Sequence, residues 1–294
     1  MLSTLNNQFG SSLNKNVSSF FVPGPRSAAF IVTIYGDIVE PRGGVLWIGN
    51  LIDLCSAVGL NESLVRTSVS RLVNAGQLVG ERSGRQSFYR LTPKAQAEYR
   101  QMAMRVYHFR NPPKDWMIIA RSDVEMDDCL KTRNFAVMNR NLLFGPNTSD
   151  DYPDALVFEA KAIHGEQRLK KFVSTFWDID KIASCYHCFI QKYRGFEHMA
   201  LGNLSPLESL LARLAVVHDY RLSLANDPDL PRNSLPADWP ADEAKKLFAR
   251  LYLRLSDEAE NFIHENFKTN DGQLARNTEL TDLRSASLQK ILAN

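Results

Sequence analysis

A short stretch, residues 61–91, constrains the fold of this chain more than any other feature, because a capped helix is followed at once by a hairpin. Asn61 is a favourable N-cap residue, and Gly76 stands where a helix commonly ends. These signals predict a helix over residues 62–75. Two short apolar runs then flank a turn at residues 82–85, which predicts a β-hairpin with a basic tip.

The two faces of the predicted helix differ in composition. Apolar and small side chains recur at helical spacing and are expected to pack inward: Leu64, Val65, Ser68, Val69, Leu72 and Val73. The opposite face carries cations and short hydrogen-bonding side chains: Ser63, Arg66, Thr67, Ser70, Arg71 and Asn74. After Glu62 this outer face has no carboxylate, so it suits contact with an anionic partner.

The composition of the outer face is that of a DNA-reading helix. An α-helix fits the major groove of B-DNA, where Arg can donate two hydrogen bonds to guanine and Ser, Thr or Asn can bond bases or phosphates. We therefore expect base contacts from Arg66, Thr67, Ser70 and Arg71, with Ser63 and Asn74 as second choices. At the hairpin we expect contacts to phosphates or the minor groove from Arg82 and Arg85, and backbone contacts from Arg90 and Lys94.

The distribution of charge favours this interpretation. Residues 61–110 contain nine Lys or Arg and three Glu, a net charge of +6, whereas the whole chain carries only +2. The remaining residues therefore sum to −4. A locally basic segment in an otherwise mildly acidic protein is typical of a domain that meets phosphate.

Two other interpretations of the same stretch remain open. An amphipathic helix and hairpin with an ordinary solvated face would show the same periodicity. A helix and hairpin of this kind can also serve as a docking surface for another protein. The docking interpretation predicts that the protein has no salt-sensitive affinity for DNA.

Elements on both sides extend the pattern. Periodicity and breakers predict helices at residues 26–39, 51–58 and 94–107 and a strand at residues 45–48. The order helix, strand, helix, helix, hairpin is that of a winged helix-turn-helix domain. We place this domain at residues 23–110, after a flexible polar tail at residues 1–22.

A boundary follows at residues 111–113, Asn-Pro-Pro, because consecutive prolines form a stiff, extended joint. Beyond it we expect strands at residues 116–120, 142–144 and 155–163 and helices at residues 124–132 and 166–175. This order resembles a ferredoxin-like α+β unit, which we place at residues 114–175, although a fourth strand is not evident. Residues 176–294 are expected to form a helical domain, with helices at residues 206–224, 241–267 and 287–292.

Composition excludes several classes of protein. With 44% hydrophobic and 23% charged residues, the chain has the composition of an ordinary globular protein. No run of eighteen apolar residues predicts a membrane span, and the N-terminus does not resemble a signal peptide, so we expect a cytoplasmic protein. Four cysteines need no disulfide framework in a chain of 294 residues.

Enzyme motifs are weak. Cys185 and Cys188 have redox-pair spacing but lack the sequence context of a redox or zinc site. Cys185 falls on the apolar face of its helix, so we expect it to be a packed thiol. Asp123, Asp127 and Asp128 leave a metal-dependent nuclease as an alternative function. The six histidines have no ligand spacing, and no Walker, GxSxG or GxGxxG motif occurs. We therefore expect no enzyme, no catalytic residues, no metal and no cofactor.

Seven short stretches carry a family pattern: residues 31–37 (IVTIYGD), 47–51 (WIGNL), 61–67 (NESLVRT), 85–91 (RQSFYRL) and 176–178 (FWD), and a Pro-rich pair at residues 227–231 (DPDLP) and 235–240 (LPADWP). With these stretches the chain resembles the PaaX-like family, the transcriptional repressors of phenylacetic acid degradation. Together they extend over most of the chain, from about residue 28 to residue 255.

The resemblance implies a winged-helix N-terminal domain, a ferredoxin-like middle domain and a helical C-terminal domain that helps the chain to dimerise. It also implies a repressor of an aromatic-acid catabolic operon, released from DNA by an aryl-CoA thioester such as phenylacetyl-CoA. A homodimer would place its reading helices on a palindromic operator, with half-sites about 34 Å apart or a multiple of that spacing. The effector-binding residues are not indicated by any stretch of the sequence.

Overall fold

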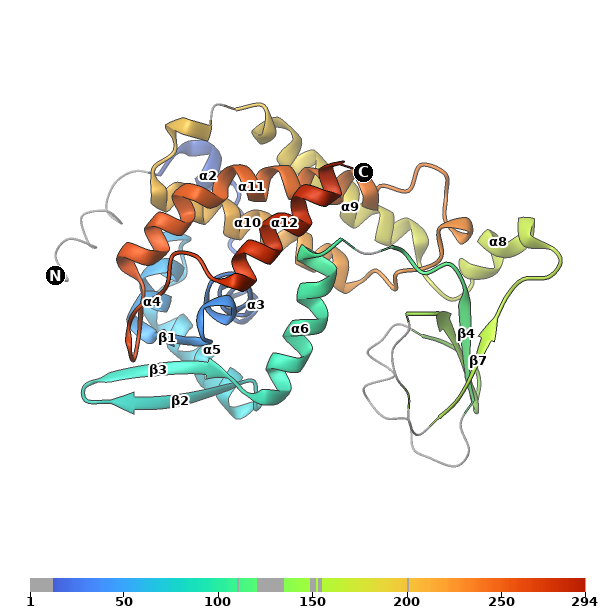
Figure 1. Cartoon of the computed structure of the whole chain (residues 1–294), viewed down its shortest axis with the longest axis horizontal. Coiled ribbons are helices and arrows are strands. Elements are labelled where there is room, and N and C mark those ends of the chain that lie inside the picture. Colours follow the sequence, from blue (N-terminus) through green and yellow to red (C-terminus); the bar gives the residue numbers. More distant parts are fainter. Residues whose placement is uncertain are drawn as a thin grey trace. The chain divides into compact units, whose positions relative to one another are not determined.

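The computed structural model spans the chain, and its described residues are 13–109, 111–120, 135–148, 152, 155–199 and 201–293. They form two compact units, each described by itself (Figure 1). The first unit comprises Met1–Phe109, Ile190–Arg221 and Lys245–Asn294, and the second comprises Arg110–Phe189 and Leu222–Ala244. The architecture is mixed α+β with a helical C-terminal part, as the sequence predicts.

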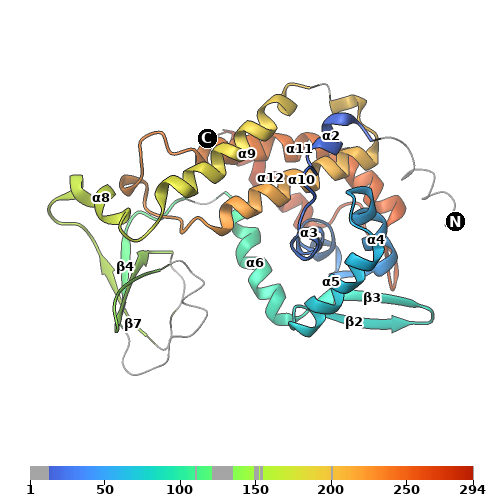
Figure 2. The same cartoon turned by 180° about the vertical axis from the view of Figure 1, so that it is seen from behind.

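The first unit contains the helices and strands predicted before residue 110. They are α3 (Ser27–Ile34), β1 (Val45–Trp47), α4 (Ile48–Ala57), α5 (Glu62–Asn74), β2 (Leu78–Ser83), β3 (Gln86–Leu91) and α6 (Pro93–Tyr107). The strands form an antiparallel sheet in the order β1-β3-β2. In both views the β2–β3 hairpin extends away from the helices of this unit (Figures 1 and 2).

Part of the predicted flexible tail is ordered, which corrects the sequence interpretation for residues 13–22. Asn14 caps the short helix α2 (Lys15–Ser19), and Val17 is fully buried. The ring of Phe20 packs edge-on against that of Phe196, with centroids 4.8 Å apart. Three apolar anchors among many polar residues give no helical period, so the sequence did not indicate this packing. Residues 1–12 lie outside the described part of the chain.

The C-terminal part contains the long helices α9 (Ile179–Glu197), α10 (Pro206–Ala225), α11 (Ala241–Asn266) and α12 (Glu279–Ala293), with short 3₁₀ turns η4 (Leu201–Asn203) and η5 (Arg232–Ser234). A two-stranded ribbon, β8 (Lys268–Thr269) and β9 (Gly272–Gln273), joins α11 to α12. Residues 190–221 and 245–294 belong to the same compact unit as the N-terminal elements. The predicted domains at residues 114–175 and 176–294 therefore do not coincide with the compact units. That three parts of the chain fold independently stays a prediction.

Helix α12 is longer than the helix predicted at residues 287–292. Its buried residues are Thr281, Arg284, Leu288 and Ile291, which follow a helical period. Two of these four side chains are polar. An apolar pattern alone therefore did not reveal the first half of the helix.

The predicted helix at residues 26–39 is not a regular α-helix to its end. After α3 the chain forms a π-helical turn, η1 (Tyr35–Val39), and a 3₁₀ turn, η2 (Glu40–Arg42), and it ends at Gly43 with a φ of 92°. Asp37 lies in the π-helical turn and is only 1% exposed. A carboxylate is almost never buried to this extent unless it is paired.

Asp37 is the centre of a buried ionic network within the first unit. Its Oδ2 accepts a hydrogen bond from Nε of Arg213 on α10 at 3.0 Å, and its Oδ1 accepts one from the hydroxyl of Tyr107 at 3.1 Å. Arg213 also donates to Glu260 on α11 at 2.8 Å. Nη1 of Arg284, on α12, donates to the backbone carbonyl of Asp37 at 3.0 Å. The network thus joins the π-helical turn to three C-terminal helices.

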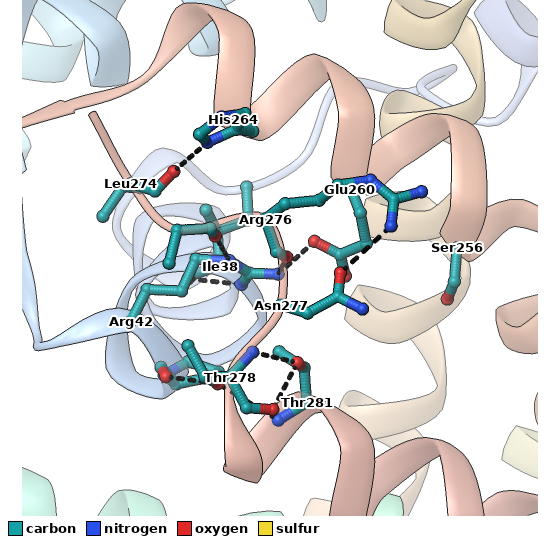
Figure 3. A network of polar contacts seen from close by, with 12 residues as sticks. Ile38, Arg42, Ser256, Glu260, His264, Leu274, Arg276, Asn277, Thr278 and Thr281 are labelled. Carbon is teal, nitrogen blue, oxygen red and sulfur yellow. Dashed lines mark hydrogen bonds and ion pairs between the residues drawn. The ribbon is translucent and has the colours of Figure 1, made fainter.

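Arg42 extends the network toward the C-terminal loop (Figure 3). Its guanidinium is fully buried and forms an ion pair with Glu260. It also donates to the backbone carbonyl of Ile38 and, through Nε, to that of Ala275, each at 2.8 Å. The hydroxyl of Thr278 donates to the carbonyl of Pro41 at 2.9 Å. Residues 41–42 and the loop before α12 are therefore joined by partly buried hydrogen bonds.

The second unit contains a four-stranded antiparallel sheet in the order β5-β6-β4-β7. Its strands are β4 (Trp116–Ala120), β5 (Ala136–Asn139), β6 (Leu142–Pro146) and β7 (Leu156–Ala160). The sequence analysis missed β5, an edge strand in which only Ala136 is buried. The predicted strand at residues 155–163 is shorter in the structure. The predicted helix at residues 124–132 lies outside the described residues.

A short helical segment and the Pro-rich loop complete the second unit. The 3₁₀ turn η3 (Glu166–Arg168) leads into α8 (Leu169–Val173), within the helix predicted at residues 166–175. In the Pro-rich loop the carboxylate of Asp227 accepts hydrogen bonds from the hydroxyl of Tyr186 on α9 and from the backbone N–H of Asp229. These bonds fix Asp229 with a φ of 62°, in the left-handed region.

Breaking the ionic network is expected to destabilise the first unit. Asp37→Ala leaves Arg213 buried beside an empty position, and removing one partner of a buried pair costs about 3–5 kcal/mol. Asp257→Ala is the matched control, because Asp257 also pairs with an arginine, Arg276, but its side chain is 79% exposed. Exposed pairs contribute about 0–1 kcal/mol. Urea denaturation measures both variants, and equal losses of unfolding free energy would contradict the assigned role of Asp37.

Glu40 is expected to make stability depend on pH. Burial raises the pKa of Glu40 from 4.5 to about 7, and its Oε1 has no hydrogen-bond partner in the described structure. Because the folded-state pKa is raised, its contribution to stability is present below pH 4.5 and is lost as the pH rises through 7. The stability of Glu40→Gln relative to the natural chain should therefore increase as the pH rises from 5 to 8. Thermal melts at both pH values test this, with Glu98→Gln on the exposed side of α6 as control.

Candidate nucleic-acid interface

Helix α5 presents the predicted outer face to solvent. All six outer residues are exposed: Ser63, Arg66, Thr67, Ser70, Arg71 and Asn74. The buried face consists of Val65, Ser68, Val69 and Leu72. Leu64 and Val73, which were predicted to pack inward, are 41% and 37% exposed. Because each residue turns the helix by 100°, these two side chains lie on the flanks of the buried stripe and border the outer face.

Both ends of α5 are fixed by backbone hydrogen bonds. The side chain of Asn61 accepts from the N–H of Leu64 at 2.9 Å, which confirms the predicted N-cap. At the other end Gly76 has a φ of 66°, and the N–H of Gln77 donates to the carbonyl of Leu72 at 2.9 Å. This is the glycine-terminated end that the sequence predicts. The outer face is therefore carried by a helix of defined length.

The outer side chains differ in the ion pairs and hydrogen bonds that they form within the protein. Arg66 is paired with Glu62 one turn earlier, with Nη2 and Nε each 2.7 Å from Oε1, and both side chains are more than half exposed. The hydroxyl of Thr67 donates to the carbonyl of Ser63 at 2.8 Å. The side chain of Arg71 has no ion pair or hydrogen bond to any described residue. Of the two arginines on this face, Arg71 can therefore bind an external partner without breaking an ion pair, whereas Arg66 cannot.

The hairpin has a tight turn at Gly84 and Arg85, because Ser83 pairs directly with Gln86. Gly84 has a φ of 59°, whereas Arg85 does not have a positive φ, which fits a type II′ turn with glycine in its first position. Gly80 has no side chain where the ring of Tyr89 crosses the strand, and a Cβ there would lie 2.8 Å from the ring. Arg85 is therefore held at the extreme tip.

The other predicted contacts of the hairpin do not share one surface. Arg82 pairs with Ser87, and Arg90 pairs with Val79 across the ladder. Side chains alternate between the faces of a sheet, so the three-residue separation of positions 87 and 90 places Arg82 and Arg90 on opposite faces. Lys94 is exposed in the first turn of α6. The structure thus groups α5 with the hairpin, but it separates Arg82 from Arg90.

Two tyrosines that the sequence did not indicate, Tyr35 and Tyr99, hold β3 and α6 in place beside this surface. The hydroxyl of Tyr35, in the π-helical turn, donates to the carbonyl of Tyr89 on β3 at 3.1 Å, and burial raises the pKa of Tyr35. Tyr99 on α6 donates to the carbonyl of Gly36 at 2.9 Å. The turn that holds Asp37 therefore also holds the sheet and α6. A lone aspartate in an apolar run was the one sequence signal of this arrangement.

The alternative sites receive no support from the described residues. Among them no group of three or more His, Cys, Asp or Glu side chains could hold a metal ion. Asp123, Asp127 and Asp128 lie outside the described part of the chain. Cys185, which was predicted to be a packed thiol, is half-buried, and Cys188 is exposed. In the described structure no helix is both long and apolar enough to cross a membrane.

Comparison with known proteins places these features in a family. A model of the PaaX-like protein family matches residues 26–95, and a model of the PaaX-like protein C-terminal domain matches residues 177–265. The transcriptional repressor PaaX of Escherichia coli (strain K12) is 27% identical over 270 residues, which cover 84% of this chain and 85% of that protein. Among solved structures, the uncharacterized protein Rv0674 from Mycobacterium tuberculosis aligns with a TM-score of 0.40 and 20% identity over 71% of this chain and 88% of that one.

The two family models match separate segments that together make up more than half of the chain. The first segment contains α5 and the hairpin, and the second contains most of the C-terminal helices and the Pro-rich loop. The protein belongs to the PaaX-like family.

Proposed function

We propose that this protein is a sequence-specific DNA-binding repressor of transcription and acts in the cytoplasm. The observation that carries the proposal is the outer face of α5, which carries exposed arginines and short polar side chains beside a hairpin tipped by Arg85. The similarity to a protein named as a transcriptional repressor supports the same role. A regulator of this kind is a binding protein and not an enzyme.

The finer description of the fold belongs to the same proposal. We assign residues 23–110 to a winged helix-turn-helix, in which α4 braces α5 and the β2–β3 hairpin is the wing. The sheet order β5-β6-β4-β7 is the antiparallel order expected of a ferredoxin-like unit. Such a unit also needs one helix between its first two strands and another between its last two. The predicted helix at residues 124–132 falls outside the described residues, and α8 follows the fourth strand, β7, so it does not take the second position.

The partners follow from the resemblance to the family. A homodimer would present two α5 helices to the half-sites of a palindromic operator, separated by about 34 Å or a multiple. Its regulated genes would serve aromatic-acid catabolism. The effector would be an aryl-CoA thioester such as phenylacetyl-CoA, and its binding would release the DNA. The protein needs no metal or cofactor for this cycle.

Fluorescence anisotropy tests the function directly. The purified protein is titrated onto its own upstream promoter DNA and onto scrambled DNA, with and without phenylacetyl-CoA. We expect tight binding only to the promoter, reversed by the thioester. Equal affinity for both DNAs would refute a specific repressor. Metal-dependent cleavage of the DNA would favour the nuclease, and the absence of salt-sensitive binding would favour a protein-docking module.

Arg71 is expected to read a base. Arg71→Ala should lower operator affinity by about 1–3 kcal/mol and relax specificity at one base pair. Arg71→Lys keeps the charge but loses the planar fork that bonds guanine, so it should also lose specificity while keeping the salt dependence. Anisotropy on operators changed one base pair at a time measures both effects. Full specificity in the lysine variant would show that Arg71 contacts only phosphate.

Arg85 is expected to contact the DNA backbone. Arg85→Ala should weaken binding to operator and scrambled DNA alike and reduce the slope of log affinity against log salt by about one unit. Arg140 is a matched control, because it is also exposed in the two-residue turn of a hairpin, between β5 and β6. Arg140→Ala should leave the slope unchanged. If both variants changed the slope equally, the wing assignment would fail.

Glu62 is expected to restrain DNA binding. It holds Arg66 and places a carboxylate at the end of α5 that approaches phosphate. Exposed pairs four residues apart contribute only a few tenths of a kcal/mol, so the pair can open at low cost. Glu62→Gln should raise operator affinity roughly two- to fivefold at low salt. Unchanged or weaker binding at equal helix content, measured by circular dichroism, would show that Arg66 does not meet DNA.

A further inference from the structure

An open pocket in the second unit has a chemistry that the DNA-binding surface does not use. Its volume is about 280 Å³, and it lies beside α8 and the ends of β4, β6 and β7. Aromatic side chains line one part of it, and cationic or titratable side chains line another. The residues that matter here are Trp116, Phe144, Phe172, Lys161, His164 and Arg168.

The aromatic part of the pocket offers a flat apolar surface. The rings of Trp116 and Phe144 are stacked, with centroids 4.6 Å apart and an interplanar angle of 13°. The ring of Phe172, on α8, stands at 72° to that of Phe144 with centroids 5.6 Å apart, and Phe172 is 39% exposed. Trp116 and Phe144 are buried, so Phe172 is the ring of the three that presents substantial surface to a ligand. Aromatic side chains that line a concave surface are typical of sites that bind a planar or acyl group.

Trp116 adds an unsatisfied hydrogen-bond donor. The residue is 4% exposed, and its indole Nε1 has no hydrogen-bond partner in the described structure. A buried donor without an acceptor is unfavourable. An oxygen of a ligand that reached this N–H would remove that cost. A carbonyl or carboxylate oxygen next to the apolar group of the ligand has the required chemistry.

The polar part of the pocket favours an anion. Lys161, His164 and Arg168 are exposed and form no ion pair with any described residue. Among the side chains that the structure describes, no acidic one lines the pocket. Glu159 precedes the pocket-lining Ala160 on β7, and because side chains alternate along a strand it points to the other face of the sheet. The described cations and donors of the pocket therefore favour negative charge next to the apolar group of the ligand.

We propose that this pocket binds the aryl or acyl group of an anionic acyl thioester, with the phosphates of the carrier held at Lys161 and Arg168. The volume is at the lower limit of the roughly 300–1,000 Å³ found for ligand pockets, so it accommodates the acyl group and leaves the nucleotide outside. The identity of this ligand as the effector rests on the proposed function. The pocket itself is inferred from the structure.

The position of the pocket in the chain offers a route to regulation. The ring of Phe172 contacts that of Phe176, with centroids 5.2 Å apart. The ring of Phe176 in turn contacts that of Trp177, with centroids 5.9 Å apart. α9 begins two residues after Trp177, and its residues 179–189 belong to the second unit while residues 190–197 belong to the first. A ligand that draws α8 toward the sheet thus acts on a segment continuous with the first unit.

Isothermal titration calorimetry on the full-length protein tests the proposal with three probes: phenylacetyl-CoA, phenylacetate and CoA. The double variant Lys161→Ala/Arg168→Ala removes the cations, and Ala162→Trp fills the pocket from an exposed, pocket-lining position. The matched control is Lys170→Ala/Lys171→Ala, which removes two exposed charges from α8 that do not line the pocket. Operator binding without ligand is measured for every variant, so that folding is verified separately.

We expect phenylacetyl-CoA to bind the natural chain more tightly than either fragment. The double variant should lose about tenfold or more in affinity, because hydrogen bonds to charged groups are strong, and Ala162→Trp should abolish binding. The control should bind as the natural chain does. Natural affinity in both pocket variants would overturn the pocket but leave the repressor intact. Failure of the natural chain to bind any probe would also overturn it, while specific DNA binding would still stand.

Discussion

The buried carboxylate of Asp37 determines how the first unit is assembled. An unpaired charge in a protein interior is very unfavourable, so Asp37 and Arg213 must be brought together when the chain folds. Burial alone would lower the pKa of Arg213, but Asp37 and Glu260 outweigh it and raise that pKa well above its usual value. The guanidinium of Arg284 adds a contact with the ring of Tyr107 at 4.0 Å. Segments far apart in the sequence are therefore required for the same core.

The same turn also supports the proposed DNA-binding surface on α5 and the hairpin. The π-helical turn that buries Asp37 also carries Tyr35, which holds β3. The sheet, α6 and the C-terminal helices are thus attached to one irregular turn, and α5 is positioned by packing on this assembly. A change in the C-terminal helices can therefore reach β3 through hydrogen bonds and α5 through packing. Such an arrangement suits a protein whose DNA affinity is to be regulated.

The sequence predicted the elements that depend on local chemistry. The N-cap at Asn61, the glycine end at Gly76 and the alternation around the hairpin are short-range signals, and the structure contains all three. It did not predict pairings over long distances. Asp37 and Arg213 are 176 residues apart, and neither has a local pattern that reveals the other. The same holds for the pocket, because its rings come from separate strands and from α8. Edge strand β5 was missed because half-exposed apolar residues alternate weakly there.

The central claim is that α5 and the hairpin meet DNA, and hydrogen–deuterium exchange of the full-length protein with and without operator DNA tests it most directly. Our account predicts slower exchange on DNA binding at the N-terminal turn of α5, whose first amides lack helical partners, and along residues 77–91. The sheet of the second unit should exchange at an unchanged rate. Protection confined to β4–β7, with α5 and the hairpin unaffected, would contradict the account.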